Sequence, residues 1–444
     1  MKSFTVKGGC SHISAALSFS GDKSIAHRGA ILGALAAGIT TLRNFPANED
    51  CLSTLSIIKR LGVRVTRNGA AVRIAGRGAR GLKSSRGHLL IKESGTTYRL
   101  MLGVLSGQNF SSVLSAGASL SGRPMRRVTV PLRRMGARIR GRRKSGEEYP
   151  PVSISPGKLS GITYRMPVPS AQVKSAILLA GLFARGRTTV IEQTPTRDHT
   201  ERMLEAFGAA VRRSREGRGA SVRNCFSVEG GRALSSPGTV TIPGDISSAA
   251  FFIVLGSIIP GSRIRIRNIG LNATRSGIIT VLRRMGAHIR VCREYPGAEP
   301  RGDILVTSAI LKGTTVTARE IPLLIDELPV LMVAAACARG TTVFKSAQEL
   351  RVKETDRINS MLSNLSRMGV DGWVKKSGRA EDVIITGIRE LRGAWVSSFG
   401  DHRTAMSMAI AGIKARGATV IDDIECINKS FPGFIDTLKK AARC

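Results

Sequence analysis

The sequence predicts an α/β protein of two similar domains, each built from three strand–helix–strand–helix–strand–strand repeats. The length is the first reason, because 444 residues exceed what one hydrophobic core usually organises. The second reason is that two markers recur in phase at intervals of about 70–80 residues, which indicates whole supersecondary units that bury their faces against neighbours. Six such units fit the chain, three to a domain.

The first marker is a Gly-x-Thr/Ser-x-apolar segment that indicates the start of a short strand. Its copies begin at Gly38, Gly186, Gly261, Gly340 and Gly417, with a weaker copy near Gly107. The second marker is an apolar-Gly-apolar triplet, in which glycine suits a left-handed helix C-cap directly before a strand. Its copies are centred on Gly62, Gly136, Gly208, Gly286 and Gly369.

Two related segments predict where the domains meet. Residues 20–24 and 243–248 both contain Gly-Asp-x-Ser and open an apolar helix. We interpret them as the two crossovers between domains. One domain then contains residues 1–20 plus 243–444, and the other contains residues 21–242.

The net charge of +37 allows two interpretations. Nucleic-acid binding is the usual reading of such a charge, and residues 126–144 are densely basic. Against it, the arginines are spread along the whole chain, aromatic residues make up only 4%, and no nucleic-acid motif is present. A basic field also attracts small polyanionic substrates, so we expect no specific nucleic-acid partner.

Cysteine usage and hydropathy predict a cytoplasmic protein. The seven cysteines form no Cys-x-x-Cys pair and no even framework, which favours a reducing compartment and argues against a zinc site. Residues 1–8 lack the apolar core of a signal peptide. The longest apolar stretches, 249–259 and 330–338, are too short to cross a bilayer, so no membrane partner is expected.

Five segments combine a cation with small or hydroxyl residues at a predicted helix start. Residues 21–28 contain Lys23, Ser24 and Arg28, although a capped surface helix has the same pattern. Residues 94–99 place Gly95 among hydroxyl residues, which also fits a plain turn. The other segments are 169–175, 351–357 and 400–403. Taken together they predict several anion sites, and we expect them to meet in a cleft between the domains.

Residues 351–357 carry the most informative chemistry. Lys353, Glu354 and Arg357 lie close together, and Glu354 and Arg357 can share a helix face. A carboxylate among cations suits proton transfer beside bound anions, although a solvated charged face would look the same. In residues 400–403, His402 is equally consistent with a proton shuttle and with a structural hydrogen bond.

The whole chain resembles the 5-enolpyruvylshikimate-3-phosphate (EPSP) synthases, a family of enolpyruvyl transferases. The resemblance rests on nine motifs in family order, among them Gly-Asp-Lys-Ser-x3-Arg, Arg-Asp-His-Thr-Glu-Arg and Gly-Asp-His-Arg. The nine motifs occupy residues 21–28, 94–103, 123–128, 170–176, 197–204, 243–252, 326–329, 351–357 and 400–403. The family fold is two domains of three βαβαββ repeats, each an inside-out α/β barrel, with the active site in the interdomain cleft.

The resemblance implies transfer of the enolpyruvyl group of phosphoenolpyruvate to the 5-hydroxyl of shikimate 3-phosphate, in the shikimate pathway to chorismate and the aromatic amino acids. It implies addition–elimination without metal or other cofactor. Asp326, Glu354, Lys23 and Lys353 match catalytic residues. The phosphoenolpyruvate site matches Lys23, Gly95, Arg123, Gln172, Arg357, Arg403 and Lys429. The shikimate 3-phosphate site matches Lys23, Ser24, Arg28, Ser170, Ala171, Gln172, Arg197, Asp326 and Lys353.

One departure from the family pattern is Glu93, which stands where the family usually has Asn. A carboxylate beside an anion site should weaken phosphoenolpyruvate binding unless it points away or pairs with a cation. Gly95 leaves room near that site, so we expect some inhibition by glyphosate, a ligand of the phosphoenolpyruvate site in this family.

The nearest rival is the related UDP-N-acetylglucosamine enolpyruvyl transferase. Its loop carries a catalytic Cys, whereas residues 117–127 here contain none and Cys51 lies elsewhere. That enzyme has a Lys-Asn pair at the position where this chain has Lys23-Ser24. We therefore favour EPSP synthase and expect a monomer that acts on two small anions.

Overall fold

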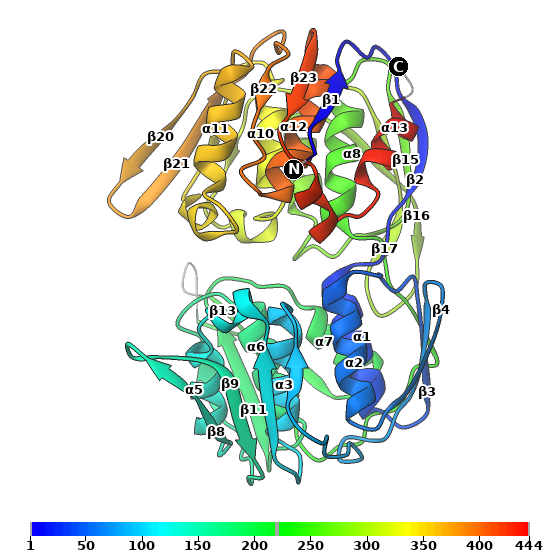
Figure 1. The fold of residues 1–444 in the computed structure, drawn as a ribbon, viewed down its shortest axis with the longest axis vertical. Coiled ribbons are helices and arrows are strands. Elements are labelled where there is room, and N and C mark those ends of the chain that lie inside the picture. Colours follow the sequence, from blue (N-terminus) through cyan, green and yellow to red (C-terminus); the bar gives the residue numbers. More distant parts are fainter. Residues whose placement is uncertain (1, 218–221, 443–444) are drawn as a thin grey trace. The chain divides into compact units, whose positions relative to one another are not determined.

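The computed structural model describes residues 2–217 and 222–442, and it has the mixed α/β character predicted (Figure 1). Packing divides the chain into two compact units. Unit 1 contains Met1–Phe19, Gly244–Tyr295 and Pro300–Cys444, and unit 2 contains Ser20–Pro243 and Pro296–Glu299. The four-residue segment Pro296–Glu299 was not anticipated from the sequence, because the strands on either side of it belong to unit 1.

The sheets in both units follow one topology. In each four-stranded sheet the first two strands are parallel, and the third and fourth are each antiparallel to their neighbour. In unit 2 the sheets are β14 (Thr239–Thr241), β3 (Ile39–Arg43), β5 (Ala71–Ala75), β4 (Arg64–Asn68); β6 (Leu89–Ile91), β7 (Ser112–Ala116), β9 (Glu147–Ser155), β8 (Arg138–Lys144); and β10 (Thr163–Arg165), β11 (Arg187–Glu192), β13 (Arg223–Glu229), β12 (Val211–Glu216).

Unit 1 repeats this arrangement, with one sheet of three strands. Its sheets are β2 (Ser14–Ser18), β15 (Arg263–Gly270), β17 (Arg301–Thr307), β16 (His288–Tyr295); β18 (Thr315–Val316), β19 (Thr341–Phe344), β21 (Ala380–Thr386), β20 (Gly372–Ser377); and β22 (Trp395–Val396), β23 (Ala418–Ile421), β1 (Phe4–Lys7). β1 lies beside β23 (Figure 1), so the N-terminal strand completes the last repeat of the chain.

Three helices in each unit are buried nearly all round. In unit 2 they are α1 (Lys23–Leu35), α3 (Gly95–Leu105) and α6 (Ala171–Gly181), and in unit 1 they are α8 (Ile246–Ile258), α10 (Leu328–Ala336) and α12 (His402–Lys414). Their sequences are rich in Ala, Gly and aliphatic residues. Small residues permit close packing: a Cβ at Gly103 on α3 would lie 2.2 Å from the carbonyl oxygen of Ala176 on α6.

The remaining helices are amphipathic or short. In unit 2 they are α2 (Glu49–Arg60), α4 (Ala118–Ser121), α5 (Arg126–Arg134) and α7 (His199–Ala206). In unit 1 they are α9 (Gly277–Arg284), η2 (Ile321–Leu323), η3 (Gln348–Val352), α11 (Arg357–Arg367), η4 (Glu425–Lys429) and α13 (Phe434–Ala441).

The glycine markers have the backbone conformations that their spacing predicted. The helix-ending glycines have φ between 84° and 99°, in the left-handed region that favours glycine. The five clear strand-leading glycines also have positive φ. Gly107, the weaker copy, does not. It is constrained by packing instead, because a Cβ there would lie 2.1 Å from the ring of Phe183.

No helix in the described part of the chain is long and apolar enough to span a membrane. Cys51, Cys225, Cys292, Cys337 and Cys426 are free. Cys10 is disulfide-bonded, which departs from the expectation of a chain without disulfides.

Candidate active site

The predicted site residues are divided between the two units, and those in each unit are called its half-site. Unit 2 carries Lys23, Ser24, Arg28, Gly95, Arg123, Ser170, Ala171, Gln172 and Arg197. Unit 1 carries Asp326, Lys353, Glu354, Arg357, Arg403 and Lys429.

In unit 2 the accessible parts of α1, α3 and α6 are their first turns. The N-cap side chains are Asp22, Ser94 and Ser170, and each accepts a hydrogen bond from a backbone N–H in the first turn. The remaining N–H groups of these turns have no partner within the helix, and the helix dipole is positive there. Three helix starts in one unit therefore present the donors and field that an anion requires.

Lys23 is held by a carboxylate that sequence reasoning missed. Its Nζ lies 2.6 Å from Oδ2 of Asp50 on α2. Burial alone would raise the pKa of Asp50, but the charge and hydrogen bond of Lys23 outweigh it, and the pKa lies below its usual value. Both side chains remain partly exposed, so the ammonium group is positioned without being enclosed. Asp50 lies 27 residues from Lys23 and belongs to no motif.

Arg28 is buried, and its guanidinium is already engaged by the protein. Nε donates to Thr200 Oγ1 at 2.6 Å, Nη2 to Ser175 Oγ at 2.7 Å and Nη1 to the carbonyl of Ser24 at 2.8 Å. Burial lowers the pKa of Arg28 to about 10. Arg28 thus links α1, α6 and α7, and these contacts were not predicted from the sequence. Arg197, half-buried before α7, is close enough to lower that pKa further.

Gly95 lies beneath two guanidinium groups. A Cβ at this position would lie 3.3 Å from Nη1 of Arg99 and 3.9 Å from Nη1 of Arg123. Burial lowers the pKa of Arg99 to about 10, and the nearby charges of Arg127 and Arg123 add to the effect. Mutually repelling cations over a glycine favour a bound anion at that point.

Gln172 links α6 to the start of α3. Its Oε1 accepts from Arg99 Nη1 at 2.5 Å, and its Nε2 donates to Thr96 Oγ1 at 2.9 Å. Arg99, whose position in residues 94–99 was noticed without a role, therefore lies among the residues of unit 2 that were predicted to bind phosphoenolpyruvate. The structure brings Gly95, Arg123 and Gln172 together around it.

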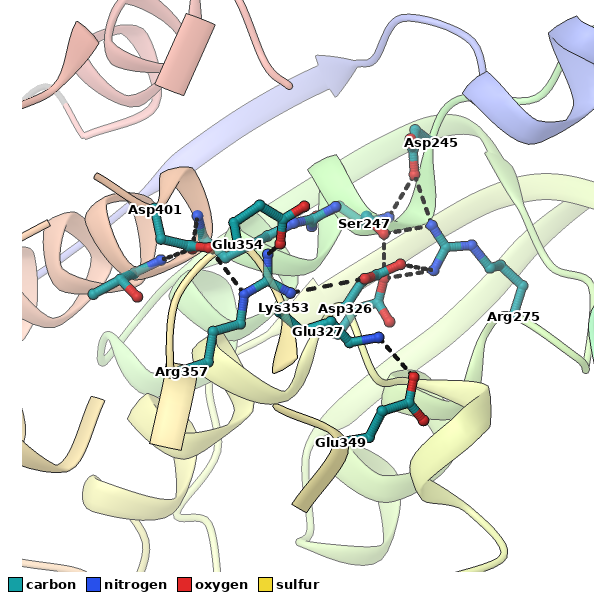
Figure 2. A network of polar contacts seen from close by, with 12 residues as sticks. Asp245, Ser247, Arg275, Asp326, Glu327, Glu349, Lys353, Glu354, Arg357 and Asp401 are labelled. Carbon is teal, nitrogen blue, oxygen red and sulfur yellow. Dashed lines mark hydrogen bonds and ion pairs between the residues drawn. The ribbon is translucent and has the colours of Figure 1, made fainter. Parts of the chain in front are cut away.

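In unit 1, Asp326 lies just before α10 in a network of charged groups (Figure 2). One oxygen lies 3.9 Å from Nη1 of Arg357, and the other lies 3.7 Å from Nη1 of Arg275. Its side chain is 27% exposed, whereas both arginines are nearly inaccessible. The carboxylate can therefore meet a substrate while the cations beside it stay fixed.

Arg357 begins α11 and is the largest fully buried side chain in the described residues. Nε donates to Asp401 at 3.0 Å and Nη2 to Glu354 at 2.7 Å (Figure 2). Nη1 has no hydrogen-bond partner within the described chain, although it faces Asp326. A buried donor left unsatisfied is costly, so this nitrogen is suited to a ligand oxygen.

Glu354 and Arg357 form an ion pair, but they do not share the helix face that was predicted for them. Asp356 is the N-cap of α11, so Glu354 precedes the helix. The Glu354 side chain is 52% exposed. Lys353 lies in the same turn and donates to Glu349 at 2.7 Å. The turn places a cation and an accessible carboxylate beside the buried Arg357.

α12 contributes the other cation of this half-site. Arg403 is buried, donates to the carbonyl of Ser247 at 3.3 Å and lies over the ring of Phe251. His402 is also largely enclosed, and burial with the charges of Arg403 and Arg357 lowers its pKa to about 3. His402 is therefore neutral near pH 7. Lys429 is exposed at the end of η4, which packs against α12.

Comparison with known proteins identifies the family. The profile of EPSP synthase (3-phosphoshikimate 1-carboxyvinyltransferase) matches residues 8–438. The chain belongs to the EPSP synthase family. The resemblance inferred from the motifs is thus confirmed, and the activity is that of a 3-phosphoshikimate 1-carboxyvinyltransferase in the shikimate pathway.

Full-length relatives support this membership. The chain is 47% identical over 440 residues to the 3-phosphoshikimate 1-carboxyvinyltransferase of Citrifermentans bemidjiense, covering 99% of both chains. It is 48% identical over 424 residues to that of Brevibacillus brevis, covering 95% of this chain and 96% of the relative. The EPSP synthase structure from Acinetobacter baumannii aligns with a TM-score of 0.90 and 42% identity, covering 99% and 98% of the two chains.

Within this EPSP synthase family member, the unusual Glu93 has a structural partner. Its Oε2 accepts from the backbone N–H of Leu120 at 2.8 Å, and its Oε1 lies against Gly117. The carboxylate thus contacts the segment that leads to Arg123. Glu93 is exposed, so its charge is not enclosed with the cations.

Proposed function

We propose that this EPSP synthase transfers the enolpyruvyl group of phosphoenolpyruvate to the 5-hydroxyl of shikimate 3-phosphate, and that both half-sites supply binding residues. Unit 2 supplies Lys23, Ser24, Arg28, Ser170, Ala171, Gln172 and Arg197 for shikimate 3-phosphate, and Lys23, Gly95, Arg123 and Gln172 for phosphoenolpyruvate. Unit 1 supplies Asp326, Lys353, Glu354, Arg357, Arg403 and Lys429.

One observation carries this proposal. Arg357 is fully buried, two of its nitrogens are fixed by carboxylates, and its remaining Nη1 faces Asp326. A substrate carboxylate or phosphate bound to that nitrogen would lie next to the candidate base. This arrangement suits an anionic substrate that reacts with a hydroxyl group, because binding and proton removal then occur at adjoining atoms.

The chemistry follows from these positions. Asp326 accepts the proton of the 5-hydroxyl, whose oxygen bonds to C2 of phosphoenolpyruvate while C3 gains a proton and becomes a methyl group. The methyl group of this tetrahedral intermediate then loses a proton, the C2–phosphate bond breaks and phosphate leaves. Glu354 and Lys353 carry the proton at C3 and hold the intermediate. The fixed cations stabilise the shifting charge without reorganising.

The same proposal covers the architecture. Units 1 and 2 would correspond to the two predicted domains, 1–20 plus 243–444 and 21–242, except that Pro296–Glu299 packs with unit 2. Each would be an inside-out barrel of three repeats, and the half-sites would meet in the cleft between them. Domain closure around two small anions is consistent with half-sites on separate units. We propose a cytoplasmic monomer that needs no metal or other cofactor.

Ligand-induced stabilisation tests the substrate assignment. Shikimate 3-phosphate should raise the thermal unfolding temperature in proportion to log concentration, and phosphoenolpyruvate should raise it further. UDP-N-acetylglucosamine should have no effect. Stabilisation by UDP-N-acetylglucosamine alone would instead favour the sister enolpyruvyl transferase. Retention on DNA would not discriminate, because a net charge of +37 binds polyanions at low salt in any case.

A further inference from the structure

A second arginine faces Asp326, and it is absent from the residues assigned to either substrate. Arg275 Nη1 lies 3.7 Å from Asp326 Oδ2, while Arg357 Nη1 lies 3.9 Å from Oδ1. Figure 2 shows the two guanidinium groups approaching the carboxylate from different elements. Each oxygen of the candidate base therefore has its own cation.

The backbone before α9 is folded to present Arg275. Asn272, which is buried, accepts hydrogen bonds through Oδ1 from the N–H of Thr274 at 2.9 Å and from its hydroxyl at 2.8 Å. The carbonyl of Asn272 accepts from the N–H groups of Arg275 and Ser276, both at 2.9 Å. This Asx turn fixes the main chain at Arg275 before the helix begins.

The Arg275 side chain is fixed at its far end as well. Nη1 lies 2.9 Å from Oε1 of Glu327, and Nη2 donates to Ser247 Oγ at 2.5 Å. Ser247 donates in turn to Glu327, and Asp245 lies 3.6 Å from Nη2. Arg275 and Glu327 are 7% and 0% exposed. The buried Arg275–Glu327 pair thus holds a cation at a constant position beside the partly exposed Asp326.

We propose that Arg275 is a positioning residue for the base Asp326. It orients Oδ2 through Nη1, and its charge keeps the carboxylate ionised until the 5-hydroxyl proton arrives. An opposite charge within about 4–6 Å lowers a carboxylate pKa by roughly 1–3 units. Loss of Arg275 should therefore raise the pKa of Asp326 and protonate part of the base at mildly acid pH. This inference rests on the proposed function.

Other charged groups near Asp326 act in the same network and must stay constant in the test. Two of them precede helices α9 and α8, namely Arg275 and Asp245, and Glu327 is the residue after Asp326. The others lie at the starts of α11 and α12 and are Lys353, Glu354, Arg357, Asp401, His402 and Arg403. Arg275 hydrogen-bonds Glu327 and Ser247, neither of which is a proposed substrate ligand.

The test is the pH profile of kcat for Arg275→Gln at saturating phosphoenolpyruvate and shikimate 3-phosphate. The acid limb should move upward by on the order of one pH unit, because the uncharged amide no longer favours the ionised base. On the plateau above the limb, kcat should recover to within a fewfold of the native value. KM for phosphoenolpyruvate should stay within about threefold of the native value, since Arg275 is not among its proposed ligands.

Two further variants separate positioning from folding. Arg275→Lys keeps a cation for the buried Glu327 and beside Asp326, so it should fold and retain the native acid limb. Thermal unfolding shows whether Arg275→Gln is folded. Arg284→Gln removes an arginine from the same helix α9 that pairs with Glu320 near the surface, and its profile should match the native one.

An unshifted acid limb in folded Arg275→Gln would overturn the assignment of Arg275. A uniform loss of kcat at all pH values, with no shift, would also overturn it, because that pattern reports structural damage alone. Absence of turnover in the native enzyme with both substrates would overturn the proposed function itself, and the role of Arg275 with it.

Discussion

Nε of Arg357 donates to the carboxylate of Asp401 at 3.0 Å, and both side chains are almost completely buried. Asp401 is also the N-cap of α12, where it accepts from two backbone N–H groups. One carboxylate thus orders the start of a helix and fixes the buried arginine of the adjoining helix. The two motifs at residues 351–357 and 400–403 meet through this contact.

Asp401→Asn should weaken phosphoenolpyruvate binding and folding together. Asparagine can still cap α12, but it removes the charge that compensates Arg357. We expect the free energy of unfolding to fall by about 3 kcal/mol, and KM for phosphoenolpyruvate to rise about tenfold, equivalent to about 1.4 kcal/mol. Urea unfolding and steady-state kinetics measure both effects. Asp382→Asn, which loses a partly exposed pair with Lys345, should change neither by comparable amounts.

Asp326→Asn should lower kcat by about 10²–10⁴ and leave KM for phosphoenolpyruvate nearly unchanged, because a general base acts in the transition state and asparagine keeps the shape of the side chain. Steady-state kinetics at pH 7 give the comparison. A loss smaller than tenfold would assign the base to another group.

Glu93→Gln should lower KM for phosphoenolpyruvate by about threefold. Glutamine can still accept from Leu120 N–H, so the local loop is kept while the negative charge near Gly95 and Arg123 is removed. Glu93→Asn, which is shorter, should show the same direction if charge is the cause. An unchanged KM in both variants would mean that the exposed carboxylate is screened.

His27 should make folding sensitive to acid. Burial, aided by the charge of Lys23, lowers its pKa to about 3, whereas the unfolded chain has the ordinary value of 6.5. Between these values the unfolded state binds more protons, so stability is complete above pH 6.5 and is lost as the pH falls. At pH 5 the loss from this one group should be about 2 kcal/mol.

Urea unfolding at pH 7 and pH 5 tests the role of His27. The stability difference between the two pH values should shrink by that amount in His27→Asn and stay the same in His88→Asn, whose imidazole is exposed. An equal difference in native protein and His27→Asn would show that other groups carry the acid sensitivity.

The features predicted from the sequence are mostly local. The recurring glycines fix left-handed turns by their own conformational freedom, and Asp22, Ser94 and Ser170 cap helices within three residues of themselves. Both features depend on neighbouring residues alone, so the sequence pattern was enough to predict them. The motifs include the residues at the accessible ends of those helices and therefore indicated the candidate site.

The features that sequence reasoning missed are contacts between distant segments. Asp50 pairs with Lys23 across 27 residues, and Arg275 meets Asp326 and Glu327 across about 50. Arg28 was predicted as a ligand for shikimate 3-phosphate, and its contacts with Thr200 and Ser175, more than 140 residues away, were not predicted. An Asn-x-Thr-Arg segment before a helix was the available sign of Arg275. Nothing in the sequence pointed to Asp50, whose position depends on how α1 and α2 pack.

Phosphate release by the purified protein, supplied with phosphoenolpyruvate in the presence and absence of shikimate 3-phosphate, tests the central claim most directly. We expect phosphate release only when both substrates are present, and we expect Asp326→Asn to abolish it. Release from phosphoenolpyruvate alone, or an undiminished rate in Asp326→Asn, would contradict it.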